Sequence, residues 1–273
     1  MTDTLTTAEF SDLLGQCRRR QWVALIATTV GAAVLACAFY YADAFNMARY
    51  ADAAPTLLQL AADALPPDFS RWRDWGRPLL ETLSMGVAGA MLATLAALPL
   101  AALSARNVTR SVWLGGGVRL ALNVVRSIPC LIWGVVFVAA VGFGPLPGVL
   151  ALAVHSTGML GKLFAEAIEH ADPAPGAALR SHGVSRIGVL RFALLPQILP
   201  RLADFVLYRF EHNLRAATTL GLVGAGGLGL EIVTAFHLFE YREASGLILV
   251  LVALVTLVNF FGAALRKSFL QGE

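Results

Sequence analysis

The chain of 273 residues is 57% hydrophobic and only 14% charged, whereas a soluble globular domain carries roughly a quarter charged residues. Its formal net charge of +3 is too small to indicate nucleic-acid binding. Composition therefore favours an integral membrane protein of the all-α class over a soluble domain. The positions of the basic residues then become informative, because Lys and Arg in short loops indicate the cytoplasmic side.

The first long apolar stretch runs from Trp22 to Tyr41, about the 20 residues that a helix needs to cross the hydrocarbon core. Arg18, Arg19 and Arg20 directly precede it, so we expect the N-terminus in the cytoplasm. The polar segment 42–77 follows and is expected to be external. Its arginines depart from the charge rule, and its aspartates count little in that rule.

Further apolar stretches predict five more spans, at residues 79–103, 127–141, 149–164, from 202 onward and 246–265. A Gly- and Pro-rich turn at 142–148 separates two of them, because these residues break helices. Arg266 and Lys267 end the last span, which places both termini inside. The expected fold is thus an all-α polytopic membrane protein with about six transmembrane helices.

We divide the chain into residues 1–78 and 79–273. The first part holds a cytoplasmic segment, one transmembrane helix and the external segment. The second is a core with an amphipathic approach at 111–126 and a basic cytoplasmic loop at about 165–201.

Several apparent motifs fail because of their context. The glycines from Gly224 to Gly229 satisfy a dinucleotide-binding pattern, but that pattern requires a preceding strand in a soluble βαβ unit. The histidines show no metal-ligand spacing, and no Ser, Cys or carboxylate stands in a recognisable nucleophile setting. We therefore expect no catalytic residue, no metal and no cofactor in this chain, which argues against an enzyme.

The loop at 165–201 is the most informative segment. Two short helical stretches are expected on either side of Gly183, since only Gly adopts φ > 0 freely. Pro196 is expected to end the second of them. Such a helix pair cannot bury its own apolar face, so it needs either the membrane surface or a partner protein.

The spacing from Ala178 to Gly183 to Leu195 and Pro196 resembles the coupling motif of permease subunits of ABC importers. The usual Glu of that motif is replaced by Ala177, and two further positions also differ. Longer segments resemble the phosphonate-transport permease: residues 126–129, 137–142, 150–155, 161–167, 208–215 and 217–227. The resemblance covers roughly residues 80 to 265.

Membership of that family implies a type I ABC importer permease fold in the cytoplasmic (inner) membrane. It implies two permease chains, as a homodimer among lipid, with two ATPase subunits that bind ATP and Mg and an external substrate-binding protein. The cargo would be phosphonate, phosphite or hypophosphite, moved by alternating access. The ATPase-coupling residues implied by the resemblance are Ala177, Ala178, Gly183, Arg186, Leu195 and Pro196.

Polar residues within or beside the expected spans form a tentative substrate pathway: Arg126, His155, Arg209, Glu211, Asn213 and Arg215. Glu211 and Arg215 are spaced to pair on one helix face, and Arg209 shares another face with Asn213. Two interpretations stay open. These groups either satisfy one another and lock the bundle, or Arg209 or Arg215 lends positive potential to an anion pathway.

Two other function classes remain at this point. One is a membrane scaffold or assembly protein without a transport path. The other is an ATP-independent secondary carrier, which the lack of detectable inverted repeats disfavours.

Overall fold

The computed structural model describes residues 7–109 and 111–270, and all regular elements within these ranges are helices. They are α1 Thr7–Tyr41, α2 Met47–Asp63, α3 Gly76–Ser104, α4 Val112–Ser127, α5 Cys130–Val141, α6 Pro145–Glu169, α7 Pro173–Ser181, α8 Arg186–Val189, the π-helical turn η1 Leu190–Leu194, α9 Leu195–Leu220, the 3₁₀ turn η2 Gly221–Val223, α10 Gly227–His237 and α11 Tyr241–Leu270. The all-α class is confirmed.

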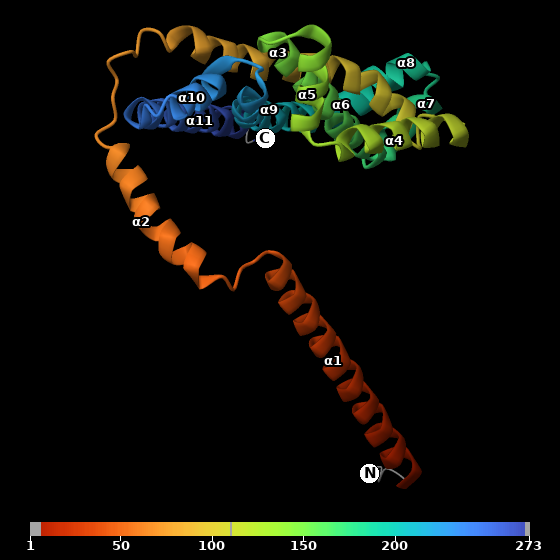
Figure 1. The fold of residues 1–273 in the computed structure, drawn as a ribbon. Coiled ribbons are helices and arrows are strands. Elements are labelled where there is room, and N and C mark those ends of the chain that lie inside the picture. Colours follow the sequence, from red (N-terminus) through yellow and green to blue (C-terminus); the bar gives the residue numbers. More distant parts are fainter. Residues whose placement is uncertain (1–6, 110, 271–273) are drawn as a thin grey trace. The chain divides into compact units, whose positions relative to one another are not determined.

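The chain forms two compact units that divide between residues 62 and 63. The first contains α1 and nearly all of α2, and the second contains α3 to α11 (Figure 1). The helix α2 lies within the segment that the sequence marked only as polar, and it accommodates Pro55. The division expected between residues 78 and 79 stays a prediction.

Within the described residues, four helices are long and apolar enough to cross a membrane: Arg18–Tyr41 of α1, then α3, α6 and Tyr241–Lys267 of α11. The pair α4 and α5 passes the same test together but is bent by 88°. The helix α9 has 26 residues, enough length to cross, yet its charged residues set it apart from these spans. The expected number of six is therefore approximate.

The third expected span differs most from the structure. Pro129 is the N-cap of α5, which then has only 12 residues, about 18 Å at 1.5 Å per residue. A helix of this length is too short to cross the hydrocarbon core alone. The bend arises because Pro129 donates no backbone hydrogen bond and disfavours helix in the residue before it.

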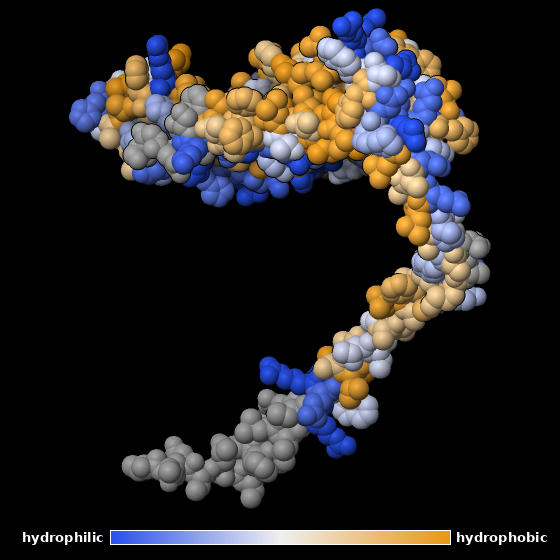
Figure 2. All heavy atoms as spheres, turned by 90° about the vertical axis from the view of Figure 1, so that its left-hand side faces the viewer, coloured by the Kyte–Doolittle hydropathy of each residue, from blue (hydrophilic) through white to orange (hydrophobic). Residues whose placement is uncertain are grey.

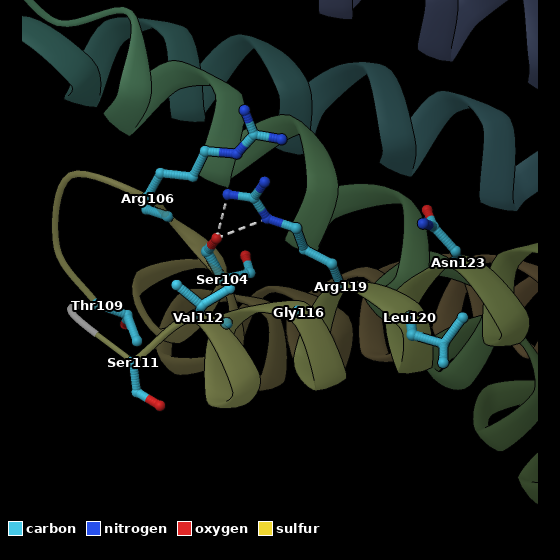
Figure 3. A pocket seen from close by; sticks show the side chains of 11 residues that line it. Ser104, Arg106, Thr109, Ser111, Val112, Gly116, Arg119, Leu120 and Asn123 are labelled. Carbon is cyan, nitrogen blue, oxygen red and sulfur yellow. Dashed lines mark hydrogen bonds between the residues drawn. The ribbon is translucent and has the colours of Figure 1, made fainter.

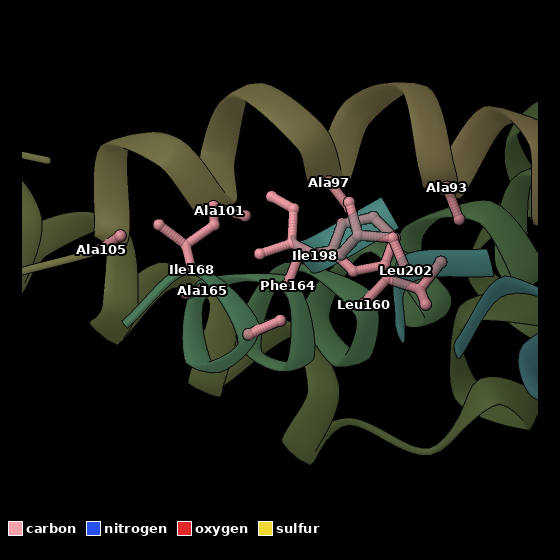
Figure 4. Close-up of a cluster of buried hydrophobic side chains, with 11 residues drawn as sticks. Ala93, Ala97, Ala101, Ala105, Leu160, Phe164, Ala165, Ile168, Ile198 and Leu202 are labelled. Carbon is pink, nitrogen blue, oxygen red and sulfur yellow. The ribbon is translucent and has the colours of Figure 1, made fainter. Parts of the chain in front are cut away.

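Small residues allow the three central helices to approach closely. Alanines four residues apart on α3, at 93, 97 and 101, meet Leu160 and Phe164 of α6 and Leu202 of α9 in one buried cluster (Figure 4). Such stripes of small side chains are the usual way for membrane helices to pack, because lipid supplies no hydrophobic driving force between them. This packing fixes α9 beside α6.

Two helix breaks meet within the second unit. The backbone N–H of Gly144, in the break before α6, donates to the carbonyl of Gly224, in the break before α10, at 3.1 Å. The N-terminus of α10 is capped by α3, where Thr82 accepts from the N–H of Leu228 at 2.9 Å. The expected break at 142–148 is confirmed, although the helix α6 already begins at Pro145.

A broad apolar area covers much of the visible face of the second unit, with hydrophilic residues toward its ends and along its lower edge (Figure 2). The exposed large apolar side chains of this unit include Leu95, Phe260 and Phe261, which lie on α3 and α11. An exposed apolar surface of this extent is expected of helices that face lipid. Together with the spans, it identifies a multi-pass membrane protein.

Candidate functional site

The helices α7 and α8 form a compact turn at one end of the second unit (Figure 1). Asp172 caps α7 by accepting from the N–H of Ala174 at 2.9 Å. Gly183 separates the two helices with φ of +77°, in the left-handed region that favours Gly. The expectation of two short helices around Gly183 is thereby confirmed.

Gln197 ties the two ends of this loop together. Its side-chain Oε1 accepts from the backbone N–H of Asp172 at 2.9 Å, and its Nε2 donates to the carbonyl of Ala193 at 2.8 Å. The loop is therefore held as a unit against the start of α9. A rigid unit of this kind can transmit a displacement to the helix that follows it.

The prediction that Pro196 ends the second helix is wrong. The π-helical turn η1 runs directly into α9, and Pro196 lies in the first turn of α9. Proline has no backbone N–H, so its position donates no backbone hydrogen bond back to η1, although the helix continues. A movement of α8 therefore passes into α9 through continuous helical backbone.

The surface of the loop is apolar as well as basic. Ala177 and Ala178 are exposed, and so are Ile187, Phe192 and Leu195, at 78%, 67% and 42%. Exposed apolar side chains gathered in this way are typical of a surface that contacts either a partner protein or the membrane. The backbone of Arg186 begins α8, but its side chain lies outside the described residues.

A second group of predicted residues meets between α6 and α9. Arg209, 3% exposed, donates from Nε to the hydroxyl of Ser156 at 2.9 Å. Ser156 in turn donates to Oδ1 of Asn213 at 2.8 Å. We call Ser156, Arg209 and Asn213 the buried donor cluster. The expectation that Arg209 and Asn213 share a helix face is confirmed.

Glu211 does not pair with Arg215, contrary to the sequence prediction. It accepts from Nη2 of Arg266 at 2.7 Å, and Nε of Arg266 lies 4.0 Å from Asp204. Arg215 is exposed and forms no ion pair with another described residue. The spacing of the two residues permits a pair, but packing of α11 against α9 brings a competing guanidinium to the buried carboxylate.

The remaining pathway residues lie at the bend between α4 and α5. Nδ1 of His155 is 3.1 Å from the carbonyl oxygen of Ile128, a group that the bend leaves without a helical partner. Arg126 donates from Nε to Oδ1 of Asn123 at 3.1 Å on its own helix. The structure therefore brings two of the six pathway residues into one hydrogen-bonded cluster.

A cavity of about 730 Å³ lies between the C-terminus of α3 and α4. Figure 3 shows Arg119 reaching from α4 to the carbonyl of Ser104, to which its Nε donates at 2.8 Å. Arg119 also pairs with Glu169 at the end of α6, and Glu169 accepts from the backbone N–H of Arg106. These contacts tie the α3–α4 connection to α6.

The segment 64–75 is clasped to the start of α11. Arg71 pairs with Glu243 at 3.1 Å, and the N–H of Asp68 donates to the carbonyl of Arg242 at 3.0 Å. Glu243 raises the pKa of Arg71 by its charge, and the backbone N–H of Ser70 lowers the pKa of Asp68 by hydrogen bonding. Arg71 is thus held in an ion pair that joins the segment 64–75 to α11.

Sequence reasoning missed the two residues that complete these networks, Ser156 and Arg266. A hydroxyl within an otherwise apolar span was the available signal for Ser156, because such groups seek partners across helices. Arg266 was assigned to the flank of the last span. No group of three His, Cys, Asp or Glu side chains suited to a metal occurs within 7–109 and 111–270.

The sequence and the fold of this chain are both similar to those of known proteins. Residues 97–272 match the profile described as "Binding-protein-dependent transport system inner membrane component". The chain is 46% identical over 244 residues to the phosphite transport system permease protein PtxC of Stutzerimonas stutzeri, covering 89% of this chain and 88% of that one.

A second relative is the phosphate-import permease protein PhnE of Mycolicibacterium smegmatis. It is 39% identical over 220 residues, covering 81% of this chain and 41% of that one. Among solved structures, the fold is similar to an inward-facing MetNI methionine ABC transporter. The TM-score is 0.62 at 23% identity, over 71% of this chain and 95% of that one.

Proposed function

The chain belongs to the family of binding-protein-dependent transport system inner membrane components, and from that premise we propose that its cargo is phosphite or a closely related phosphorus oxyanion. The observation that carries this proposal is the 46% identity to a phosphite transport permease over 89% of the chain. Phosphonate, hypophosphite and phosphate are the competing cargoes, the last because a second relative is named for phosphate import.

The chain is a transport subunit and not an enzyme, since members of this family leave ATP hydrolysis to a separate subunit. It therefore works together with ATPase and substrate-binding partners. The scaffold and the secondary carrier gain no support from the relatives or from the fold neighbours.

The finer assembly belongs to the proposal. Two copies of this chain pair in the inner membrane, both termini face the cytoplasm, and two ATPase subunits bind ATP and Mg there. A binding protein delivers the anion from outside. The position of the α7–α8 turn at one end of the second unit supports such a complex, because an ATPase subunit could reach it there.

The coupling surface of the proposal is the α7–α8 turn. Ala177 and Ala178 are small and exposed, so they permit close contact with an ATPase groove. Exposed Leu195 and Pro196, in the first turn of α9, sit where a displacement of the turn enters α9. Arg186 is retained as a coupling residue on the grounds of the motif. ATP binding then displaces the turn and reorients α9.

The pathway of the proposal runs beside α9 and the α4–α5 bend. Arg126, His155, Arg209, Glu211, Asn213 and Arg215 are its candidate residues. Positive groups are needed there because an apolar route strongly opposes an anion. Buried Glu211 contributes through its ion pair with Arg266 rather than by direct contact with the cargo.

The test is reconstitution of the permease with its ATPase and binding protein in liposomes. We expect the ATPase to co-purify and ATP to drive uptake of labelled phosphite, with unlabelled phosphite competing better than phosphate or methylphosphonate. A hydrolysis-deficient ATPase is the control and should abolish uptake. Stronger competition by phosphate would reassign the cargo, and uptake without ATP would overturn the importer mechanism.

A further inference from the structure

The centre of the second unit contains a positive charge without a described counter-ion. Arg209 is 3% exposed and Asn213 is fully buried. The ion pairs described in this region join Arg266 to Glu211 and Asp204 and do not include Arg209. A buried charge without a partner of opposite sign is strongly destabilising. Its presence therefore calls for a functional explanation.

Two hydrogen-bond donors of the buried donor cluster also remain unused. Nη2 of Arg209 and Nδ2 of Asn213 are buried and have no acceptor among the described residues. Nearly all buried polar groups in proteins are hydrogen-bonded. These two donors belong to side chains that Ser156 links directly, so both can serve one acceptor molecule.

The cluster lies near the middle of its helices. Ser156 is the twelfth of the 25 residues of α6, and Arg209 is the fifteenth of the 26 residues of α9. His155, the residue before Ser156 on α6, has its Nδ1 3.1 Å from the carbonyl oxygen of Ile128, which lies between α4 and α5. The α4–α5 bend thus borders the cluster, and irregular backbone at membrane depth occurs where it is buried in protein or lines a water-filled cavity.

We propose that Ser156, Arg209 and Asn213 form an intramembrane binding site for one tetrahedral oxyanion. The site is closed in this conformation, since both free donors are buried, and it opens when α6 and α9 separate during transport. The anion accepts hydrogen bonds from Nη2 of Arg209 and Nδ2 of Asn213, and its charge balances the guanidinium. This inference rests on the proposed function and specifies where its cargo is held.

The substitution Asn213→Asp separates this site from a merely structural charge. It keeps the size of the side chain, removes a donor and places a carboxylate beside Arg209. In the binding-site case, the carboxylate occupies the position of the anion. We then expect the complex to assemble with an unfolding temperature at or above that of the wild type. Its phosphite uptake should fall about ten- to hundredfold, because a hydrogen bond to a charged group is lost.

A direct binding measurement keeps the two proposals distinguishable. The unfolding temperature of the purified permease–ATPase complex is measured with phosphite, phosphate or sulfate against chloride at equal ionic strength. It is measured both without nucleotide and with ATP bound to a hydrolysis-deficient ATPase. An anion that binds the folded state raises this temperature. We expect a rise for the wild type in at least one state and none for Asn213→Asp or Arg209→Met.

Lys162→Gln is the matched control, because Lys162 is an exposed cation of α6 whose partner is Glu166 on the same helix. It should keep the anion-dependent rise in unfolding temperature.

Wild-type uptake by Asn213→Asp would overturn the site. So would a wild-type complex that no oxyanion stabilises in either nucleotide state. If Asn213→Asp does not assemble, Arg209→Lys replaces it. We expect the anion to raise the unfolding temperature of this variant less than that of the wild type, and an equal rise would refute the site. Anion stabilisation without phosphite uptake would refute the proposed cargo alone.

Discussion

Gly183 is the residue on which the geometry of the cytoplasmic turn depends. Its φ of +77° lies in the left-handed region. The space around it is open, because no atom lies within 4 Å of the position that a Cβ would take. Backbone conformation alone, rather than space, therefore requires glycine here. Asn, which tolerates this conformation better than most residues, should be the mildest replacement.

We predict that Gly183→Val weakens ATPase binding while membrane insertion survives. A non-glycine residue in the left-handed region costs about 1–2 kcal/mol, which corresponds to roughly a five- to thirtyfold lower affinity. Binding of the ATPase to detergent-solubilised permease measures the effect. Gly183→Asn should lie much closer to wild type. Equal binding by Val and Asn variants would show that the turn does not contact the ATPase.

Glu211 illustrates a charged residue whose role only its neighbours define. Its side chain is 7% exposed and that of Arg266 is 27% exposed. We predict that Glu211→Gln destabilises the complex by about 1–3 kcal/mol, less than for a fully buried pair because Arg266 retains contact with water. Thermal unfolding of Glu211→Gln, Arg266→Gln and the double variant measures the coupling. Additive effects would rule out the ion pair.

At the scale of elements, Gly221 of η2 and Gly229 in the first turn of α10 permit a backbone contact that no larger residue allows. A Cβ at Gly229 would lie 2.0 Å from the carbonyl oxygen of Thr218, and one at Gly221 would lie 2.4 Å from the backbone of Gly229. The chain thus reverses within a few residues and returns α10 against α9. The broken helix is buried in protein, as its depth requires.

We predict that Gly229→Ala lowers the stability of the complex by about 1–3 kcal/mol, the usual penalty for overpacking. Gly116→Ala is the matched control. It lies within α4 with open space around its Cβ position, so it should be neutral or stabilise by up to about 1 kcal/mol. Unfolding temperatures of the two variants check this. An unperturbed Gly229→Ala would contradict the close contact.

At the scale of the whole molecule, the orientation in the membrane determines which surface meets the ATPase. We predict that single cysteines at Ser70 and Leu238 react with an impermeant thiol reagent added outside intact cells, and that one at Ser181 does not. Ser70, Leu238 and Ser181 are all exposed, so accessibility does not bias the comparison. The background must lack the three native cysteines.

Permeabilised cells provide the control, because Ser181→Cys should then react. Labelling of Ser181→Cys from outside would invert the orientation and remove the proposed ATPase contact. It would leave the fold unchanged, since the fold does not depend on which side is cytoplasmic.

The sequence by itself determined the membrane class, most span positions and the turn at Gly183. Each of these depends on local properties: the length of an apolar stretch, the conformational freedom of Gly, or a motif with fixed spacing. The family resemblance was likewise visible in the residues, and the match over residues 97–272 confirms it.

Only the tertiary structure decided how the charges pair. Helix periodicity places Glu211 four residues from Arg215, but α11 brings Arg266 to the same carboxylate. Periodicity places Arg209 above Asn213, but α6 supplies the serine that joins them. A sequence pattern reports neighbours on one helix, whereas the partner of a buried polar group is chosen among all helices packed against it. The unused donors at Arg209 and Asn213 could therefore be recognised only once α6 was in place.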